Sequence, residues 1–269
     1  MKDYVAKNEE ILKRWKNEME KNGEFNFAPD GIMYRGEKYN AESGNYSYHE
    51  PSNNNTEENR LWNEAPLRYL FLTKDQNCGE EDAWDVREET GRKDINSTAI
   101  TALFHRNLLY QLWGLTHTTK DKAATYDFSN AQAIDYYDCK CALARINVKK
   151  QGGNSVCSDE LLCEHLKKYK SYIVEQIQNL DADVIVCCGY SKSIELTGNR
   201  ILNFLNENGY KFEKENNWIY YDKQKNKVAV NDWHLSYRGV SSEEIFDDLT
   251  SAYQEFLKQH PSFLDSHRK

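Results

Sequence analysis

The chain contains four short apolar runs separated by longer segments in which hydrophobic residues recur at helical spacing. The runs cover residues 67–72, 141–148, 183–188 and 228–233. Each has the length of a strand that is buried on both faces. Helical spacing predicts helices at 4–21, 98–115, 158–180, 191–209 and 242–259. Ser158 is a predicted N-cap, and residues 218–234 form a predicted hairpin whose second arm contains the fourth run.

Strands that alternate with helices of this length predict right-handed crossovers and a parallel sheet covered on both faces. We therefore expect an α/β fold: a three-layer α/β/α sandwich with a central, mostly parallel four-stranded sheet. The predicted core domain covers 67–258. Residues 1–66 form an N-terminal extension, with an amphipathic helix and a polar Asn-rich loop, that packs on the core. Residues 259–269 are a C-terminal tail.

Composition narrows the class of protein. Aromatic residues make up 13% of the chain and there are only 4 Pro, which argues against disorder. No apolar run reaches 18 residues and the N-terminus is charged, so we expect a soluble protein of the cytoplasm. Seven cysteines, an odd number, are interpreted as reduced thiols without a metal site. The net charge of −8 argues against a basic coat for nucleic acid, but it permits a local basic groove.

Polar residues follow each of the four predicted strands. Asp75 comes just after the first run, Asn147 lies at the end of the second, Gly189 and Tyr190 follow the third, and His234 follows the fourth. In parallel sheets, ligands bind beyond the carboxyl ends of the strands. A carboxylate, an amide and an imidazole are therefore expected at one edge of the sheet.

These segments resemble the uracil-DNA glycosylase superfamily in order and setting. The matching stretches are LFLTKDQN, ARINVKKQGGNS, DADVIVCCGYS and VNDWHLSYRG, and the resemblance spans about residues 67–258. The chain has Thr73 and Gln76 where the family usually has Gly and Pro. The segment around Asn147 and Cys163 is similar to the branch with an iron–sulfur cluster. Only Cys163 falls at a matching cysteine position, so no cluster is expected.

The resemblance and the side-chain chemistry imply three roles. Cleavage of an N-glycosidic bond builds positive charge on the sugar and negative charge on the leaving base. Asp75 is expected to supply an anion below the sugar and to orient the attacking water. Asn147 is expected to pair with the O4/N3–H edge of uracil, and His234 to donate to O2 as a neutral imidazole. In the structural alternatives, Asp75 is a cap in a polar loop, Asn147 a turn residue and His234 a buried histidine bonded to backbone.

A second group of residues is expected to contact DNA. Leu235 is predicted to be an exposed apolar wedge that fills the gap left by a flipped nucleotide, although a Leu that anchors its own loop fits equally well. Trp84 is the candidate for stacking on the base. The candidate phosphate contacts are Lys149, Lys150, Ser236, Arg238 and the NH groups of Gly152 and Gly153.

The function predicted in this way is that of a monofunctional DNA glycosylase. It would hydrolyse the bond to uracil or a modified pyrimidine in flipped-out nucleotides, for base excision repair or defence against modified phage DNA. The reaction needs water but neither metal nor redox cofactor. DNA is the expected partner, a membrane is not, and a monomer is expected. One alternative is a non-catalytic nucleic-acid or nucleotide-binding module on the same fold. Another is a thiol-dependent hydrolase using Cys78 with His105 or His234.

Overall fold

The protein is described by a computed structural model that covers residues 1–40, 47–78, 83–89, 102–125, 141–153 and 157–267. A seven-stranded sheet forms its centre, in the order β1-β5-β4-β6-β9-β8-β7. The strands of this sheet are β1 (Gly31–Ile32), β4 (Tyr69–Thr73), β5 (Leu143–Asn147), β6 (Val184–Cys188), β7 (Glu213–Lys214), β8 (Ile219–Asp222) and β9 (Lys227–Asp232). A separate antiparallel pair contains β2 (Lys38–Asn40) and β3 (Ser47–His49).

The four predicted runs became β4, β5, β6 and β9, and these four strands are parallel. The expected sheet of four strands is corrected to seven, because antiparallel strands extend it at both sides. On one side of the sheet, β8 pairs with β9 in the predicted hairpin, and β7 pairs with β8 at the outer edge. β1 pairs with β5 and comes from the N-terminal extension. It has only two residues, which is too short for an apolar pattern to predict.

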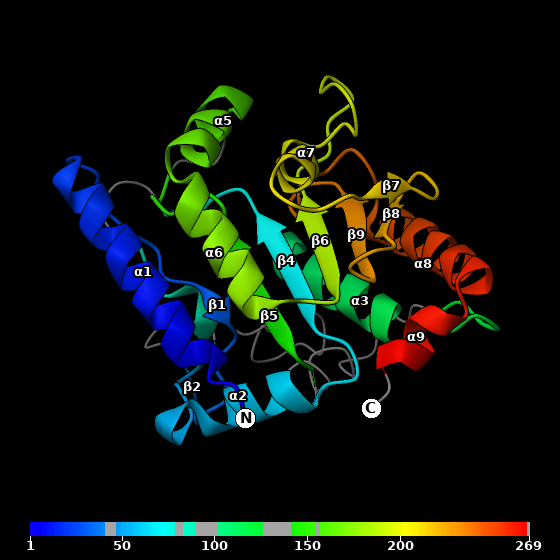
Figure 1. The fold of residues 1–269 in the computed structure, drawn as a ribbon, viewed down its shortest axis with the longest axis horizontal. Helices are drawn as coiled ribbons and strands as arrows, with labels where there is room; N and C mark the ends of the chain where they lie inside the picture. The colour runs from blue at the N-terminus through cyan, green and yellow to red at the C-terminus, as the bar shows by residue number, and fades with distance from the viewer. Residues whose placement is uncertain (41–46, 79–82, 90–101, 126–140, 154–156, 268–269) are drawn as a thin grey trace.

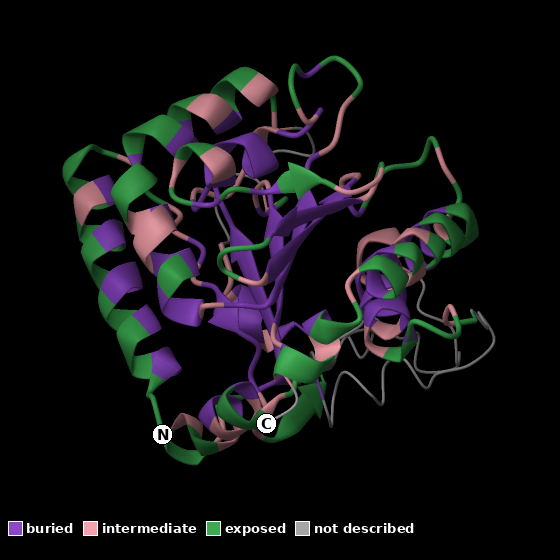
Figure 2. Cartoon of the chain, turned by 45° about the vertical axis from the view of Figure 1, so that its right-hand side comes forward, coloured by how far each residue is buried: buried purple, intermediate pink, exposed green. Residues whose placement is uncertain are grey.

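Helices cover both faces of the sheet (Figure 1). Helices α5, α6 and α7 lie over one face, and α1 packs beside α6. Helices α3 and α8 lie over the other face and contact each other. In Figure 2 the sheet is buried, and α1 turns its buried side inward and its exposed side to solvent. The eight helices of the described residues are α1 (Tyr4–Lys21), α2 (Thr56–Glu64), α3 (Leu103–His117), α5 (Asp159–Lys168), α6 (Lys170–Leu180), α7 (Arg200–Glu207), α8 (Ser242–Gln259) and α9 (Ser262–His267).

The helix predictions for 4–21 and 242–259 are confirmed as α1 and α8. Ser158 caps α5 as predicted, since its hydroxyl accepts from the Leu161 NH. The prediction for 158–180 is right in extent, but the helix breaks at Tyr169 into α5 and α6. The predicted start at residue 98 lies outside the described residues, which enter α3 at Leu103.

The helix predicted for 191–209 is too long, because only α7 forms. Leu196 and Gly198 have left-handed backbones, with φ of 63° and 76°, and a right-handed helix cannot pass through them. Asn199 then begins the helix, and its side-chain oxygen accepts from the NH groups of Ile201 and Leu202. Residues 191–199 therefore form a loop beyond the carboxyl end of β6.

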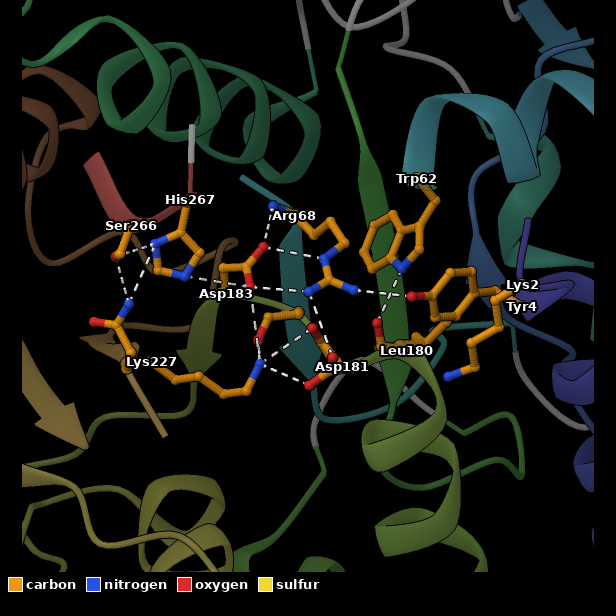
Figure 3. A network of polar contacts seen from close by, with 12 residues as sticks. Lys2, Tyr4, Trp62, Arg68, Leu180, Asp181, Asp183, Lys227, Ser266 and His267 are labelled. Atoms are coloured by element: carbon orange, nitrogen blue, oxygen red, sulfur yellow. Dashed lines mark hydrogen bonds and ion pairs between the residues drawn. The ribbon is translucent and has the colours of Figure 1, made fainter. Parts of the chain in front are cut away.

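The amino-terminal edge of the sheet is closed by a network of ion pairs (Figure 3). Arg68, just before β4, holds the Asp183 carboxylate through Nε and Nη2, at 3.0 Å each. Lys227 at the start of β9 pairs with Asp181 at 2.8 Å, and His267 of α9 lies 3.6 Å from Asp183. The network joins the starts of three strands to the last helix. None of the described helices has the length and apolar character needed to cross a bilayer.

Candidate functional site

The last residues of the four parallel strands form one row across the sheet. Strand register places Asn147 beside Thr73, and Cys188 beside Asp232. Leu72 pairs with Cys187, so Thr73 and Cys188 are the next neighbours. Side chains alternate along a strand, and the residues two positions earlier on β4, β6 and β9 belong to the hydrophobic cluster under α3 and α8. The row therefore faces α3.

Asn147 is fully buried in this row and has one side-chain group without a partner. The Thr73 hydroxyl donates to Asn147 Oδ1 at 2.5 Å. The backbone NH of Asn147 donates to Asp30 Oδ2 at 2.8 Å. The side-chain Nδ2 is buried and has no hydrogen-bond partner among the described residues. Two contacts thus hold Asn147 in place, and its Nδ2 donor has no acceptor among the residues that the structure describes.

His234 lies just beyond the end of β9 as a neutral imidazole. Burial, followed by the nearby positive charges of Lys74 and Arg145, lowers the pKa of His234 to about 4. Its Nδ1 accepts from the Ser236 NH at 3.2 Å, which places the ring proton on Nε2. The ring packs against Phe104 of α3, with centroids 6.2 Å apart. At neutral pH His234 therefore presents one N–H donor without carrying charge.

Asp75 lies in the loop after β4 and is engaged in an ion pair. Its Oδ2 accepts from Lys149 Nζ at 3.1 Å, and Lys149 also donates to the Gln151 carbonyl at 2.6 Å. Burial raises the pKa of Asp75, and Lys149 offsets only part of that rise. Gly153 packs directly against this ion pair, since a Cβ atom at position 153 would lie 2.8 Å from Asp75 Oδ2. Asp75 is thus tied to the loop after β5.

The three predicted residues occupy the same edge of the sheet without contacting one another. No hydrogen bond or ion pair of the described part of the chain joins Asp75, Asn147 and His234. Asn147 and His234 each keep a donor available, whereas Asp75 is bound to Lys149. The three residues thus lie at one edge of the sheet, as predicted, but their side chains do not contact one another.

Several residues that were predicted to contact DNA are not exposed, so these predictions are wrong. The Lys150 side chain is fully buried and pairs with Asp30, and Lys149 is nearly as buried. The NH of Gly152 donates to the Asn26 carbonyl and that of Gly153 to Gln76, so neither is open to phosphate. The physical reason is that the N-terminal extension runs over this loop: Ala28 NH bonds to the Lys150 carbonyl, and Asp30 supplies the counter-charge.

The prediction that Leu235 is an exposed wedge is also wrong. It is 1% exposed and belongs to the hydrophobic cluster under α3, so it anchors its own loop and is not an exposed wedge. Asn107 Nδ2 donates to its carbonyl at 2.7 Å. Ser236 and Arg238, on the same loop, are exposed.

Trp84 lies in a polar cluster that the sequence did not predict. Trp84 Nε1 donates to Glu89 at 2.5 Å, and Arg145 and His105 bind the other oxygen of the same carboxylate. Burial would raise the pKa of Glu89, but Arg145 and the other donors hold it well below its usual range. Arg145 also lies over the Phe104 ring, 4.4 Å from its centroid. One sequence feature could have indicated this cluster: Arg145 is a single charged residue in an apolar run, and a buried charge requires a partner.

Comparison with known proteins assigns no family. The chain matches no protein-family model and no curated protein sequence. Function is therefore inferred from the side chains at the carboxyl edge of the sheet.

Proposed function

We propose that the protein is a DNA glycosylase that hydrolyses the N-glycosidic bond of uracil or a modified pyrimidine after flipping the nucleotide out of the helix. One observation carries the proposal: a neutral imidazole and a buried, unpaired amide donor lie at the carboxyl edge of the parallel sheet. Ligands bind at this edge in α/β sheets. The resemblance of the four strand-end segments to uracil-DNA glycosylases supports the same chemistry.

Two donors suit the leaving base. Negative charge develops on the pyrimidine O2 as the bond breaks, and His234 Nε2–H can donate to it without losing its proton. With its low pKa, His234 is uncharged before the reaction and so does not attract anions in the ground state. Asn147 Nδ2 can donate to O4, while its Oδ1, which already accepts from Thr73, has a second lone pair for N3–H.

Asp75 would act on the sugar side. Its carboxylate would stabilise the positive charge that develops on deoxyribose and would orient water. Lys149 occupies Oδ2 and balances the charge of the buried carboxylate before substrate binds. The proposal requires the second oxygen, Oδ1, to reach the water.

The DNA backbone would contact the exposed loop after His234. Arg238 and Arg106 line a cavity of about 410 Å³ beside the start of α8, together with Tyr237 and Ser241. Arginine binds phosphate through two parallel N–H donors. Arg238 and Ser236 are retained from the predicted phosphate contacts, whereas the buried Lys149, Lys150 and Gly152 are not proposed again.

The direct test is cleavage of single- and double-stranded oligonucleotides that contain uracil or modified cytosines, read as alkali-labile sites. We expect Asp75→Asn and His234→Ala each to reduce the rate at least about 100-fold. His260→Ala is the matched control, since His260 pairs with Glu215 away from this edge. Absence of cleavage on every substrate would contradict the enzyme class. Unchanged cleavage in both variants would contradict only the residue assignment.

The Asp75–Lys149 ion pair favours a second candidate, a non-catalytic module that binds nucleic acid or nucleotides on the same fold. A carboxylate committed to Lys149 is a poor base. This candidate predicts DNA binding that weakens with salt but yields no product, with equal affinity in Asp75→Asn and in the unmodified protein.

A further inference from the structure

A cavity of about 480 Å³ lies at the carboxyl edge of the sheet, on the side that carries β8 and β7. Its volume is in the range of small-molecule sites. Neither Asp75, Asn147 nor His234 lines it, so it is separate from the candidate site. Four large aromatic side chains do line it, and they come from the ends of β6 and β9, the turn before β8, and β8 itself. These are Tyr190, Trp233, Trp218 and Tyr220.

Hydrogen bonds fix the wall that the loop after β6 forms. Asn231 of β9 donates from Nδ2 to the Thr197 carbonyl at 2.9 Å, and its Oδ1 accepts from Asn199 at 3.0 Å. The NH of Tyr190 donates to the Asp232 carbonyl at 2.7 Å. The loop is thus tied to the end of β9 at several points. A wall held in this way is formed before a ligand binds, which lowers the entropic cost of binding.

The aromatic rings of the cavity support one another. The centroids of Tyr190 and Trp233 are 4.5 Å apart, with the ring planes at 89°. Tyr237, which does not line this cavity, stacks on Trp233 at 4.4 Å with the rings 6° from parallel. Burial, followed by the nearby Tyr190, raises the pKa of Tyr220, so these two phenol groups are close. Aromatic side chains arranged around a cavity favour a ligand that contains a flat ring.

Charged side chains of both signs border the same cavity. Lys192 follows β6 and Lys214 ends β7, whereas Glu244 and Asp248 are four residues apart on α8 and share one face of that helix. All four side chains are exposed. Lysines bind phosphate as point charges, and carboxylates accept from hydroxyl or amino groups and repel phosphate. The charges therefore favour a ligand with an anionic end and another part that carries O–H or N–H donors.

We infer that this cavity binds a nucleotide. The base matches the aromatic rings, the phosphate matches the two lysines, and the sugar hydroxyls or base amino groups match the two carboxylates. A simple anion would leave the rings unused, and an amine would be repelled by the lysines. The nucleotide has two sources, a free mononucleotide and one unit of a single DNA strand. Neither source needs glycosidic cleavage, so the inference goes beyond the proposed function.

Isothermal titration calorimetry of the full chain separates the two sources. The probes are the 5′-monophosphates of adenosine, guanosine, cytidine and uridine, the four nucleosides, and a single-stranded DNA octanucleotide without uracil or modified bases. We expect at least one monophosphate or the octanucleotide to bind with a Kd of about 0.1 mM or lower. Binding of a monophosphate identifies a free nucleotide, and binding of the octanucleotide alone identifies a strand. A nucleoside that binds as tightly as its monophosphate, or no binding of any probe, would overturn the inference.

The phosphate contact is tested with the double variant Lys192→Ala, Lys214→Ala. Binding of the monophosphate or the octanucleotide should weaken about tenfold, while binding of a nucleoside should not change. The matched control is Lys13→Ala, Lys21→Ala, which removes the same charge from exposed positions on α1. Both lysine pairs are exposed, so neither variant should unfold. Equal weakening in the two variants would show that overall charge, and not this cavity, sets the affinity.

The base contact is tested with Trp218→Ala. Loss of stacking should weaken nucleosides, monophosphates and the octanucleotide alike, by about tenfold, and Trp218→Phe should keep most of the affinity. Tyr39→Ala removes an aromatic side chain of 39% exposure from β2 and should have no effect. Unchanged affinity in both Trp218→Ala and the lysine variant would overturn the site. These ligands contain no cleavable base, so the result stands whether or not uracil is excised.

Discussion

The two edges of the parallel sheet differ in how completely their buried polar groups are paired. At the amino-terminal edge, Arg68 and Lys227 meet Asp183 and Asp181 in a closed network (Figure 3). At the carboxyl-terminal edge, Lys149 and Lys150 are also paired, with Asp75 and Asp30. There, however, Asn147 keeps a buried Nδ2 without a partner among the described residues, and burial dominates the pKa of Asp232. Both edges are built from the same strands, so the difference lies in the side chains placed on them. The amino-terminal edge is thus fully paired, whereas the carboxyl-terminal edge combines ion pairs with a buried amide donor that has no partner among the described residues.

Breaking the amino-terminal network should have the largest effect on stability. Asp183→Ala would leave Arg68 without its bidentate partner, and we expect the free energy of unfolding in urea to fall by about 3–5 kcal/mol. The Asp183 side chain is 6% exposed and that of Asp181 is 50% exposed. Asp181→Ala is therefore the control, with an expected loss of about 1 kcal/mol or less. Equal losses in the two variants would contradict the assignment of the network's strength to the buried pair.

The pH dependence of stability should separate Asp232 from the paired carboxylates. Its folded pKa of about 7 lies above the value near 3.9 of an unfolded aspartate, so the native state holds the proton more tightly. Its contribution is fully present below about pH 4 and is lost as pH rises to about 7, by up to about 4 kcal/mol. The measurement is urea unfolding of the unmodified protein and of Asp232→Asn from pH 4 to 8. A constant difference between them would contradict the raised pKa of Asp232.

The regular elements were predictable because their signals are local. The four central strands are continuous apolar runs, and α1 and α8 show helical spacing from end to end. The strand β1 has no such signal, since two residues cannot show a period. The loop at 191–199 was mistaken for helix because the spacing of apolar residues gives no sign of the left-handed φ at Leu196, a residue that usually favours a right-handed helix.

The sequence predicted where the residues of the candidate site lie on the sheet, but not which of their neighbours are paired. Asn147 and His234 follow strands, and the rule for parallel sheets places them at one edge. Which charges are free depended on segments far away in sequence. Asp30, from the N-terminal extension, buries Lys150, and Glu89 neutralises Arg145. A pair of lysines after a strand is typical of an exposed loop, and nothing local showed that the N-terminal extension would cover it.

A smaller effect is expected where the carboxyl edge would meet DNA. Arg238 is exposed, so Arg238→Ala should leave stability unchanged and weaken DNA binding about five- to tenfold, with a salt slope reduced by about one. Lys13→Ala, on the exposed side of α1, removes the same charge away from this edge. Affinity measured by fluorescence anisotropy at several salt concentrations tests both. Equal weakening in the two variants would show that binding follows overall charge and not the carboxyl edge.

The smallest expected change is in the protonation of His234. Burial and the charges of Lys74 and Arg145 keep its pKa at about 4, below the value near 6.5 of an unfolded histidine. Between pH 8 and 5.5 the ring should therefore stay neutral, and its NMR resonance, assigned by its loss in His234→Ala, should hardly move. In urea the same resonance should titrate near pH 6.5. Its contribution to stability is present above about pH 6.5 and is lost as pH falls toward 4, opposite in direction to that of Asp232. A midpoint near 6.5 in the folded protein would mean that His234 is solvated, and the carboxyl edge would then lose its neutral donor.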